Sequence, residues 1–374
     1  MTMRRSWAED TRLPGPTVRP ALRRLADGSA PLADADWILL LQAQGDELDE
    51  LCNMADVARR DAVGDELTFV ANRNFETGTV LDLVEVPLLE DLVTEAWTLG
   101  ATEICMQGPV PATRPASDYL TVIERIRAVA PEMHLHAYRV PEVIDAAQRL
   151  GVSVREFYLA AQAAGVGTVP GTAAQVLDDS IREALSPNGQ ALPVEAWVET
   201  ITTAHDVGLK STATMLYGHL ERPDHQVAHL RLLGDIQART GGFTELILMP
   251  MVPELAPPHL RDVATGSASL RETRAVHAVA RLVLRESFDH VQAAWTKLDA
   301  EALTAVLRGG ADDVGGVLID GTLLPSAGPE SGRQLVPAEV ERLAADLGRT
   351  VRQRTTPYGS APAERQDVLR RVFA

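Results

Sequence analysis

The chain has very little cysteine. Its 374 residues include two, Cys52 and Cys105, one in a polar helical stretch and the other near the end of an apolar run typical of a strand. Two cysteines in such unlike settings make a poor disulfide framework and a poor metal site. We therefore expect both to be reduced structural thiols, and we predict no metal site.

Long apolar runs are also missing. None approaches the roughly 18 residues that a membrane-spanning helix requires, and the N-terminus lacks the apolar core of a signal peptide. These two features predict a cytoplasmic protein that has no membrane partner.

Basic residues are fewer than acidic ones. There are 35 Lys and Arg against 52 Asp and Glu, which gives a formal net charge of -17. Because contacts to phosphates need clustered Lys and Arg, we expect no nucleic-acid partner. The acidic balance favours solubility.

Short β-rich runs alternate with longer amphipathic runs from residue 65 onward. This alternation is typical of parallel strands joined by helical crossovers. The expected strands are 67–72, 102–107, 132–137, 166–169, 210–217, 244–249, 290–295 and 315–319. The expected helices lie near 117–130, 141–164, 194–207, 224–239 and 269–286. Eight such strands predict an α/β fold, a (β/α)8 TIM-type barrel.

The barrel is expected to carry an extension at each end. Residues 1–62 read as an N-terminal arm and a helical preface, residues 63–336 as the barrel, and residues 337–374 as a C-terminal helical tail. The Arg352 to Arg354 segment could bind an anion, but we favour a structural role in which it ties the tail to the barrel.

Sequence motifs occur in a fixed order along most of the chain. They are Gly64-Asp65, Asn72-Arg73-Asn74, Gly100-Ala101-Thr102-Glu103, Cys105-Met106-Gln107-Gly108, Pro170-Gly171-Thr172-Ala173-Ala174, Tyr217-Gly218-His219-Leu220-Glu221, Thr240-Gly241-Gly242-Phe243-Thr244-Glu245, His277-Ala278-Val279-Ala280-Arg281, Asp313-Val314-Gly315-Gly316 and Arg352-Gln353-Arg354-Thr355-Thr356. In their order and spacing the chain resembles the tyrosine-using radical SAM subunit of the synthase that makes the deazaflavin chromophore FO. The resemblance implies a barrel of the radical SAM kind.

The family's cluster loop has no counterpart in this sequence. Radical SAM enzymes carry a C-x-x-x-C-x-x-C motif after strand one, whose thiolates hold a [4Fe–4S] centre that chelates SAM. Here residues 72–74 are followed by 75–82 without a cysteine, and Pro87 is expected to begin the next helix. Carboxylates in this segment are poor cluster ligands. This reading predicts that the chain has no iron–sulfur cluster and no radical chemistry.

The SAM-binding features of the family are partly retained. Gly108-Pro109 stands where the family has a Gly-Gly pair, and Gln175 stands where it has a glutamate. The segment from Tyr217 to Glu221 is intact, and a carboxylate there suits a ribose hydroxyl pair. The resemblance therefore suggests SAM or a related adenosyl compound as a ligand. The residues predicted to bind it are Gln107, Thr172, Tyr217 and Glu221.

Two histidines at strand ends are candidate acid–base groups, because imidazole titrates near neutrality. These are His136 and His219. Each has an equally weighted alternative as a hydrogen-bonded remnant of an ancestral pocket. His134 shares a strand face with His136, but no third ligand for a metal is evident. Family histidines are missing from 251–257 and 328–332.

Three functions remain open from the sequence. The favoured one is a cluster-free protein repurposed for polar chemistry on a small ligand, such as SAM-dependent group transfer or elimination. The second is a non-catalytic partner of a true radical SAM enzyme. The third is a protein that binds a deazaflavin or another small molecule. The residues do not decide whether the chain is an enzyme. They also do not decide whether it forms a homodimer or a complex with a biosynthetic enzyme.

Overall fold

The computed structural model describes residues 17–28, 31–84, 88–186, 191–253, 260 and 268–373. Two sequence expectations lie outside these ranges, namely most of the N-terminal arm and the place of Pro87 at the start of a helix. The described chain forms two compact units. Unit 1 is Met1–Asp65, Ala174–Ala196 and Ala213–Asp313, and unit 2 is Glu66–Ala173, Trp197–Thr212 and Val314–Ala374.

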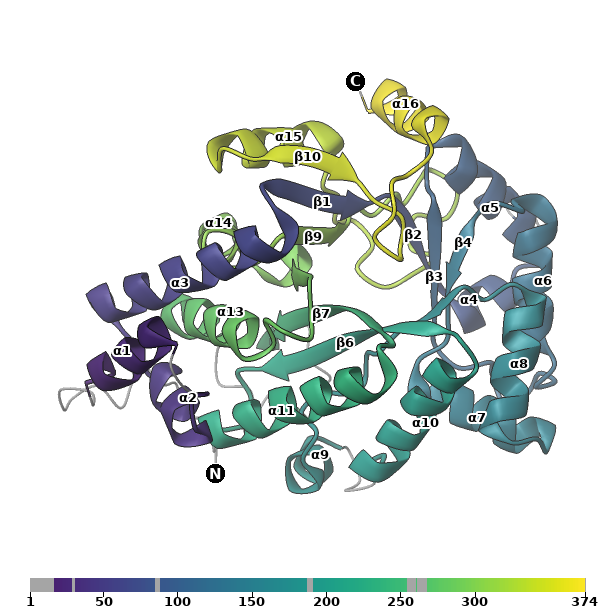
Figure 1. Cartoon of the computed structure of the whole chain (residues 1–374). Helices are drawn as coiled ribbons and strands as arrows, with labels where there is room; N and C mark the ends of the chain where they lie inside the picture. The colour runs from purple at the N-terminus through teal and green to yellow at the C-terminus, as the bar shows by residue number, and fades with distance from the viewer. Residues whose placement is uncertain are drawn as a thin grey trace. The chain divides into compact units, whose positions relative to one another are not determined.

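The described strands fall close to the predicted ones (Figure 1). They are β1 (Glu66–Val70), β2 (Asn72–Glu76), β3 (Glu103–Gln107), β4 (His134–His136), β5 (Thr168–Val169), β6 (Lys210–Tyr217), β7 (Phe243–Pro250), β8 (Val291–Ala293), β9 (Asp313–Gly316) and β10 (Thr350–Gln353). Their hydrogen-bonded order is β10-β1-β9-β8-β7-β6-β5-β4-β3-β2. All eight strand regions predicted from the sequence are confirmed.

Helices follow most of the strands. They are α1 (Arg19–Asp27), α2 (Asp34–Leu40), α3 (Gly45–Val63), α4 (Thr77–Leu81), α5 (Leu89–Thr98), α6 (Asp118–Val129), α7 (Val140–Leu150), α8 (Val154–Ala164), α9 (Asp179–Leu185), α10 (Val194–Asp206), α11 (Pro223–Thr240), α13 (Leu270–Val283), α14 (Ala300–Leu307), α15 (Pro337–Asp346) and α16 (Ala363–Val372). No helix in the described part of the chain has the length and apolar character needed to cross a membrane.

Strands β1 and β2 act as one strand that pairs on both sides. The backbone N–H of Thr102 donates to the Ala71 carbonyl at 2.7 Å on one side. On the other side, Val317 N donates to Val70 O at 3.0 Å and Ile319 N donates to Asn72 O at 2.7 Å. Residues 70–72 thus join the start of the sheet to its end within unit 2.

The side chains of β2 alternate between two faces. Arg73 turns toward α5, where its guanidinium donates to the Leu92 carbonyl at 3.1 Å and to the Glu95 carboxylate at 2.8 Å. Because successive side chains of a strand point to opposite faces, Asn74 and Glu76 lie on the face away from this helix. The side chains of Asn74 and Glu76 are thereby presented on the face of the sheet opposite to Arg73.

Three local expectations need correction. The strand expected at 67–72 does not end there, since β2 continues to Glu76, whose carboxylate then caps α4 by accepting from the Thr79 N–H at 2.6 Å. The expected helix over 141–164 is two helices, because Gly151 ends α7 in the left-handed conformation. The C-terminal tail is not purely helical, since β10 pairs in parallel with β1.

The tail segment has the structural role that we favoured. Arg352 donates to the Glu66 carboxylate at 2.7 Å, and Arg354 donates its backbone N–H to the Phe69 carbonyl at 2.8 Å. The Arg354 guanidinium lies 4.0 Å from the centre of the Tyr358 ring. These contacts hold β10 against β1 by main-chain and side-chain interactions together.

In unit 1, α3 of the helical preface packs along α13 (Figure 1). The contact is close at Gly310, where an added Cβ would lie 3.1 Å from both Ala55 Cβ and Arg281 Cβ. Arg274 of α13 also donates to Asp49 of α3 at 2.6 Å. The preface is thus an integral layer of unit 1.

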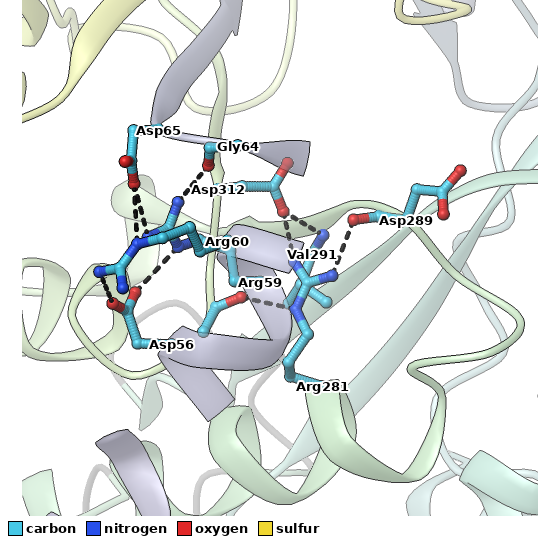
Figure 2. A network of polar contacts seen from close by, with 10 residues as sticks. Asp56, Arg59, Arg60, Gly64, Asp65, Arg281, Asp289, Val291 and Asp312 are labelled. Carbon is cyan, nitrogen blue, oxygen red and sulfur yellow. Dashed lines mark hydrogen bonds and ion pairs between the residues drawn. The ribbon is translucent and has the colours of Figure 1, made fainter. Parts of the chain in front are cut away.

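A buried ion pair stabilises this part of unit 1 (Figure 2). Arg281 donates to the carbonyls of Gly310 and Asp289, each at 2.7 Å, and to the Asp312 carboxylate at 2.5 Å. Asp312 also accepts from Val291 N at 2.7 Å, and His290 Nδ1 lies 2.7 Å from it. Burial opposes ionisation of Asp312, but His290 and Arg281 outweigh it, so its pKa lies below the ordinary value.

We predict that Arg281→Met lowers the free energy of unfolding by about 3 to 5 kcal/mol, because it leaves the Asp312 carboxylate buried without its cation. Urea denaturation followed by circular dichroism measures the loss. The matched control is Arg285→Met just after the same helix, where the side chain is 49% exposed and the midpoint should barely move. Equal losses in the two variants would contradict the prediction.

Candidate functional site

Unit 2 brings polar side chains together on one face of four neighbouring strands. The register places Glu76 beside Gln107, Cys105 beside His136, and His136 beside Thr168. We call the set Asn74, Glu76, Cys105, Gln107, His134, His136 and Thr168 the polar face. Glu76, Gln107 and His136 are the last residues of β2, β3 and β4. In (β/α)8 barrels, ligands bind at the carboxyl ends of the strands. The polar face is therefore the candidate site that the described residues of unit 2 present.

The two histidines of β4 contact one hydroxyl. Thr168 Oγ1 lies 2.8 Å from His134 Nε2 and 2.7 Å from His136 Nδ1. Burial, followed by the nearby His134 and Arg354, lowers the pKa of His136 to about 3. Burial and the charge of Arg127 lower the pKa of His134 to about 4. Both rings are therefore neutral near pH 7.

Gln107 and Cys105 share one side of β3. The Gln107 amide donates to Cys105 Sγ at 3.4 Å, and the Gln107 main-chain carbonyl accepts from the Thr77 hydroxyl at 2.9 Å. Burial raises the pKa of Cys105 to about 12, and burial also raises that of Cys52. Both cysteines are free and buried, so the expectation of structural thiols agrees with the structure.

Residues 327–329 lie against the end of β2. Glu76 N donates to the Ala327 carbonyl at 2.7 Å, and the Asn74 amide donates to the Pro329 carbonyl at 3.3 Å. A Cβ added to Gly328 would come within 2.0 Å of the Asn74 carbonyl oxygen. Only glycine fits such a close approach. Residues 327–329 thus border the polar face next to β2.

Thr172 follows the end of β5 and is half-buried. Its neighbour Gly171 is fixed by a hydrogen bond from its N–H to Thr212 Oγ1 at 2.8 Å. Among the six predicted site residues, Gln107, His136 and Thr172 belong to unit 2.

The other three predicted site residues belong to unit 1. Glu221 accepts from Gly218 N at 2.6 Å, from His219 N at 2.8 Å and from the Gln226 amide at 2.9 Å. Its side chain is 1% exposed. The carboxylate thus closes the turn after β6. Its oxygens accept hydrogen bonds from the turn, as they would from the hydroxyl pair of a ribose. Its role as a ribose ligand stays a prediction.

His219 and Tyr217 are likewise bonded within unit 1. Leu220 N donates to His219 Nδ1 at 2.7 Å, so His219 Nε2 carries the proton that it shares with the Leu216 carbonyl at 3.0 Å. The Tyr217 hydroxyl donates to Thr273 Oγ1 of α13 at 3.3 Å, and burial raises its pKa. These bonds direct Tyr217 toward the helix layer. The proposed acid–base and cofactor roles of both residues stay predictions.

Sequence reasoning missed Thr168, although it is the residue that joins the two histidines. The alternation of His134 and His136 indicated a shared strand face, but only the β4–β5 register places Thr168 beside them. A short β-rich run at 166–169 carries no signal of that register.

Comparison with curated proteins finds close relatives along nearly the whole chain, although no family model matches it. The chain is 39% identical over 371 residues to an FO synthase of Streptomyces coelicolor, covering 94% of this chain and 43% of the relative. It is 36% identical over 323 residues to the 5-amino-6-(D-ribitylamino)uracil–L-tyrosine 4-hydroxyphenyl transferase of Archaeoglobus fulgidus, covering 83% and 93%. The chain thus spans less than half of the FO synthase but nearly all of the transferase.

Solved structures share the fold at low identity. The FeFe-hydrogenase maturase HydG from Carboxydothermus hydrogenoformans superposes with a TM-score of 0.63 at 14% identity, covering 91% of this chain and 80% of that one. Methylornithine synthase (PylB) gives 0.64 at 14% identity, covering 93% and 100%. The prediction of a (β/α)8 TIM-type barrel of the radical SAM kind is confirmed.

The comparisons correct the functional prediction. A protein repurposed for polar, non-radical chemistry was expected, and that expectation is wrong, because the relatives are FO synthases and a 4-hydroxyphenyl transferase. The structural neighbours, at 14% identity, support the fold alone.

The residues of this chain do not match the cluster site of such enzymes. Three thiolates hold the family's cluster, whereas this chain has two cysteines, in different units. In the part of the chain that the structure describes, no group of three His, Cys, Asp or Glu side chains could hold a metal ion. We assign no chemical step to a cluster held by this chain.

We predict that Glu221→Gln lowers the free energy of unfolding by about 1 to 3 kcal/mol, because one carboxylate oxygen becomes an NH2 group facing a backbone N–H. Thermal and urea unfolding measure it. Glu286→Gln in the same unit, with a side chain 87% exposed, should leave stability unchanged. A Glu221→Gln protein as stable as the parent would show that these hydrogen bonds do not hold the turn.

We also predict a pH dependence from His136. Because its folded pKa lies below the roughly 6.5 of an exposed histidine, its contribution to stability is complete above about pH 6.5 and is lost as the pH falls toward the folded value. In His136→Gln, the loss of unfolding free energy between pH 7.5 and 4.5 should be smaller than in the parent by up to about 2 to 3 kcal/mol. Gln107→Ala, which removes no titrating group, should keep the parental slope. Parallel slopes for the parent and His136→Gln would refute the prediction.

Proposed function

This chain belongs to the FO synthase family of radical SAM proteins, and from that membership we propose that it takes part in the transfer reaction named by its relatives. In this proposal the polar face of unit 2 binds the pyrimidine substrate, and the chain uses SAM or a related adenosyl compound. The observation that carries it is the 36% identity across 93% of the Archaeoglobus transferase.

The name of that relative describes transfer of a 4-hydroxyphenyl group from L-tyrosine to 5-amino-6-(D-ribitylamino)uracil. For this chain the same substrates are part of the proposal. A substituted uracil is neutral and has several N–H donors and carbonyl acceptors. The amides of Asn74 and Gln107 can both donate and accept, and the neutral His136 ring can do either. The polar face therefore complements a neutral heterocycle better than an anion.

The residues of this chain bind and orient the substrate in this account. The Gln107 amide is oriented by its hydrogen bond to Cys105 Sγ, and the His136 ring is oriented by its hydrogen bond with Thr168 Oγ1. Side chains that are already oriented lose little conformational entropy when a ligand binds, and this strengthens binding. His136 can also hold or release a proton at Nε2 while the ligand reacts. The other proposed partner, a complex with a biosynthetic enzyme, stays a prediction.

Calorimetry with 5-amino-6-(D-ribitylamino)uracil, L-tyrosine and SAM, each added alone and in pairs, tests the proposal. We expect the uracil to bind, and His136→Gln and Gln107→Ala each to weaken it about tenfold, as the loss of one hydrogen bond of about 1.4 kcal/mol predicts. Glu286→Gln in unit 1 serves as the control and should bind like the parent.

Product formation is measured separately by mass spectrometry under anaerobic reducing conditions, with the Archaeoglobus transferase as the positive control. Because the cysteines of this chain do not match the family's cluster site, uracil binding is the deciding measurement, and adduct formed in the presence of the chain would add catalysis to it. If no uracil binds at millimolar concentration, the proposed function is wrong.

A further inference from the structure

One hydroxyl group bridges the two histidines of β4. Thr168 Oγ1, on β5, lies 2.8 Å from His134 Nε2 and 2.7 Å from His136 Nδ1. Both distances are those of good hydrogen bonds. The three side chains belong to unit 2 and come from adjacent strands whose register pairs His136 with Thr168. They therefore form a continuous hydrogen-bonded chain along one face of the sheet.

The backbone is shaped to allow this arrangement. The His134 ring lies against Gly167, where an added Cβ would be 2.5 Å from His134 Cε1 and 2.9 Å from His134 Nδ1. Any other residue at this position would displace the ring. Gly167 is itself held in place, since its N–H donates to the Leu135 carbonyl at 2.9 Å. The position of His134 thus depends on a residue without a side chain.

Proton counting limits how the three groups can be protonated. A threonine hydroxyl has one hydrogen, so it can donate to only one of the two rings. The other ring must then donate its own N–H to the hydroxyl oxygen. A neutral imidazole carries one N–H, so the tautomer of each ring determines whether its second nitrogen is a donor or an acceptor. The hydroxyl therefore couples the tautomers of His134 and His136.

We propose that His134, Thr168 and His136 form a proton relay in which His136 Nε2 receives a proton from an N–H or O–H of the ligand bound at the polar face. As His136 Nε2 takes this proton, its Nδ1 proton passes to Thr168 Oγ1. The Thr168 hydroxyl proton passes to His134 Nε2, and His134 releases its Nδ1 proton to water. No charge accumulates on either ring, and the reverse sequence returns a proton to the ligand.

Burial is the largest influence that keeps both rings neutral, and nearby cations add to it. Arg127 acts on His134, while Arg354 acts on His136, and both cations disfavour an imidazolium. On β3, Glu103 lies opposite His134 and Cys105 opposite His136. With a pKa of about 12, the Cys105 thiol stays protonated. A proton entering at His136 is therefore passed on more readily than it is retained.

Nitrogen-15 NMR of the protein with labelled histidines tests the coupling without any ligand. Variants at His134 and His136 assign the signals among the nine histidines of the chain. In the parent and in Thr168→Ser we expect complementary tautomers, in which one ring donates to the hydroxyl and the other accepts from it. In Thr168→Val, which has a similar shape but no hydroxyl, the tautomer populations of both rings should change. Gly167→Ala should have the same effect by displacing His134.

Two outcomes would overturn the relay. In one, both rings of the parent donate to Thr168, so that no proton can pass. In the other, Thr168→Val leaves the tautomers of both rings as they were. Circular dichroism of each variant checks that the protein is still folded. If Gly167→Ala does not fold, the comparison of Thr168→Val with Thr168→Ser still decides the test.

The use of the relay in turnover rests on the function proposed above, whereas the tautomer coupling does not. Adding 5-amino-6-(D-ribitylamino)uracil should shift the signals of both rings in the parent but only those of His136 in Thr168→Val. A shift confined to His136 in the parent would overturn the relay while leaving binding intact. Complementary tautomers without any ligand-induced shift would count against the proposed substrate and retain the coupling.

Discussion

The double pairing of residues 70–72 is the constraint on which the geometry of unit 2 depends. The carbonyls of Val70 and Asn72 accept from the segment after β9, and the carbonyl of Ala71 accepts from the residue before β3. Because side chains alternate along a strand, fixing these three carbonyls also fixes which side chains of β2 face inward. A slip of one residue would turn Arg73 inward and Asn74 outward.

From this strand the register passes across the sheet to the candidate site. Asn72 pairs with Glu103, Glu103 with His134, and His136 with Thr168. Each step is a set of main-chain hydrogen bonds, which are sharply directional. The meeting of two imidazoles at one hydroxyl is therefore a consequence of sheet register across four strands and not of local sequence.

Unit 1 is stabilised by different means. Its preface helix α3 packs on α13, and the buried Arg281 holds Asp312 and two main-chain carbonyls. In the same unit, the turn after β6 uses Glu221 and His219 to satisfy its own backbone groups. Polar residues of a family motif can thus be retained because they hold a turn. For this reason an intact motif is weaker support for ligand binding than the polar face, where side chains meet from separate strands.

The sequence by itself determined the strand and helix pattern, the barrel class and the family, because hydrophobic periodicity and motif order are properties of the chain read in one dimension. It also determined that three thiolates cannot come from this chain, since it has two cysteines. It did not predict that the tail contributes β10 or that 141–164 is divided, since strand pairing and helix breaks depend on contacts made elsewhere. Three contacts are visible only in the tertiary structure. Thr168 lies between His134 and His136, Glu221 accepts hydrogen bonds from its own turn, and the Tyr217 hydroxyl contacts α13. The physical reason is that hydrogen-bond partners far apart in the sequence are chosen by strand register, which no single segment encodes.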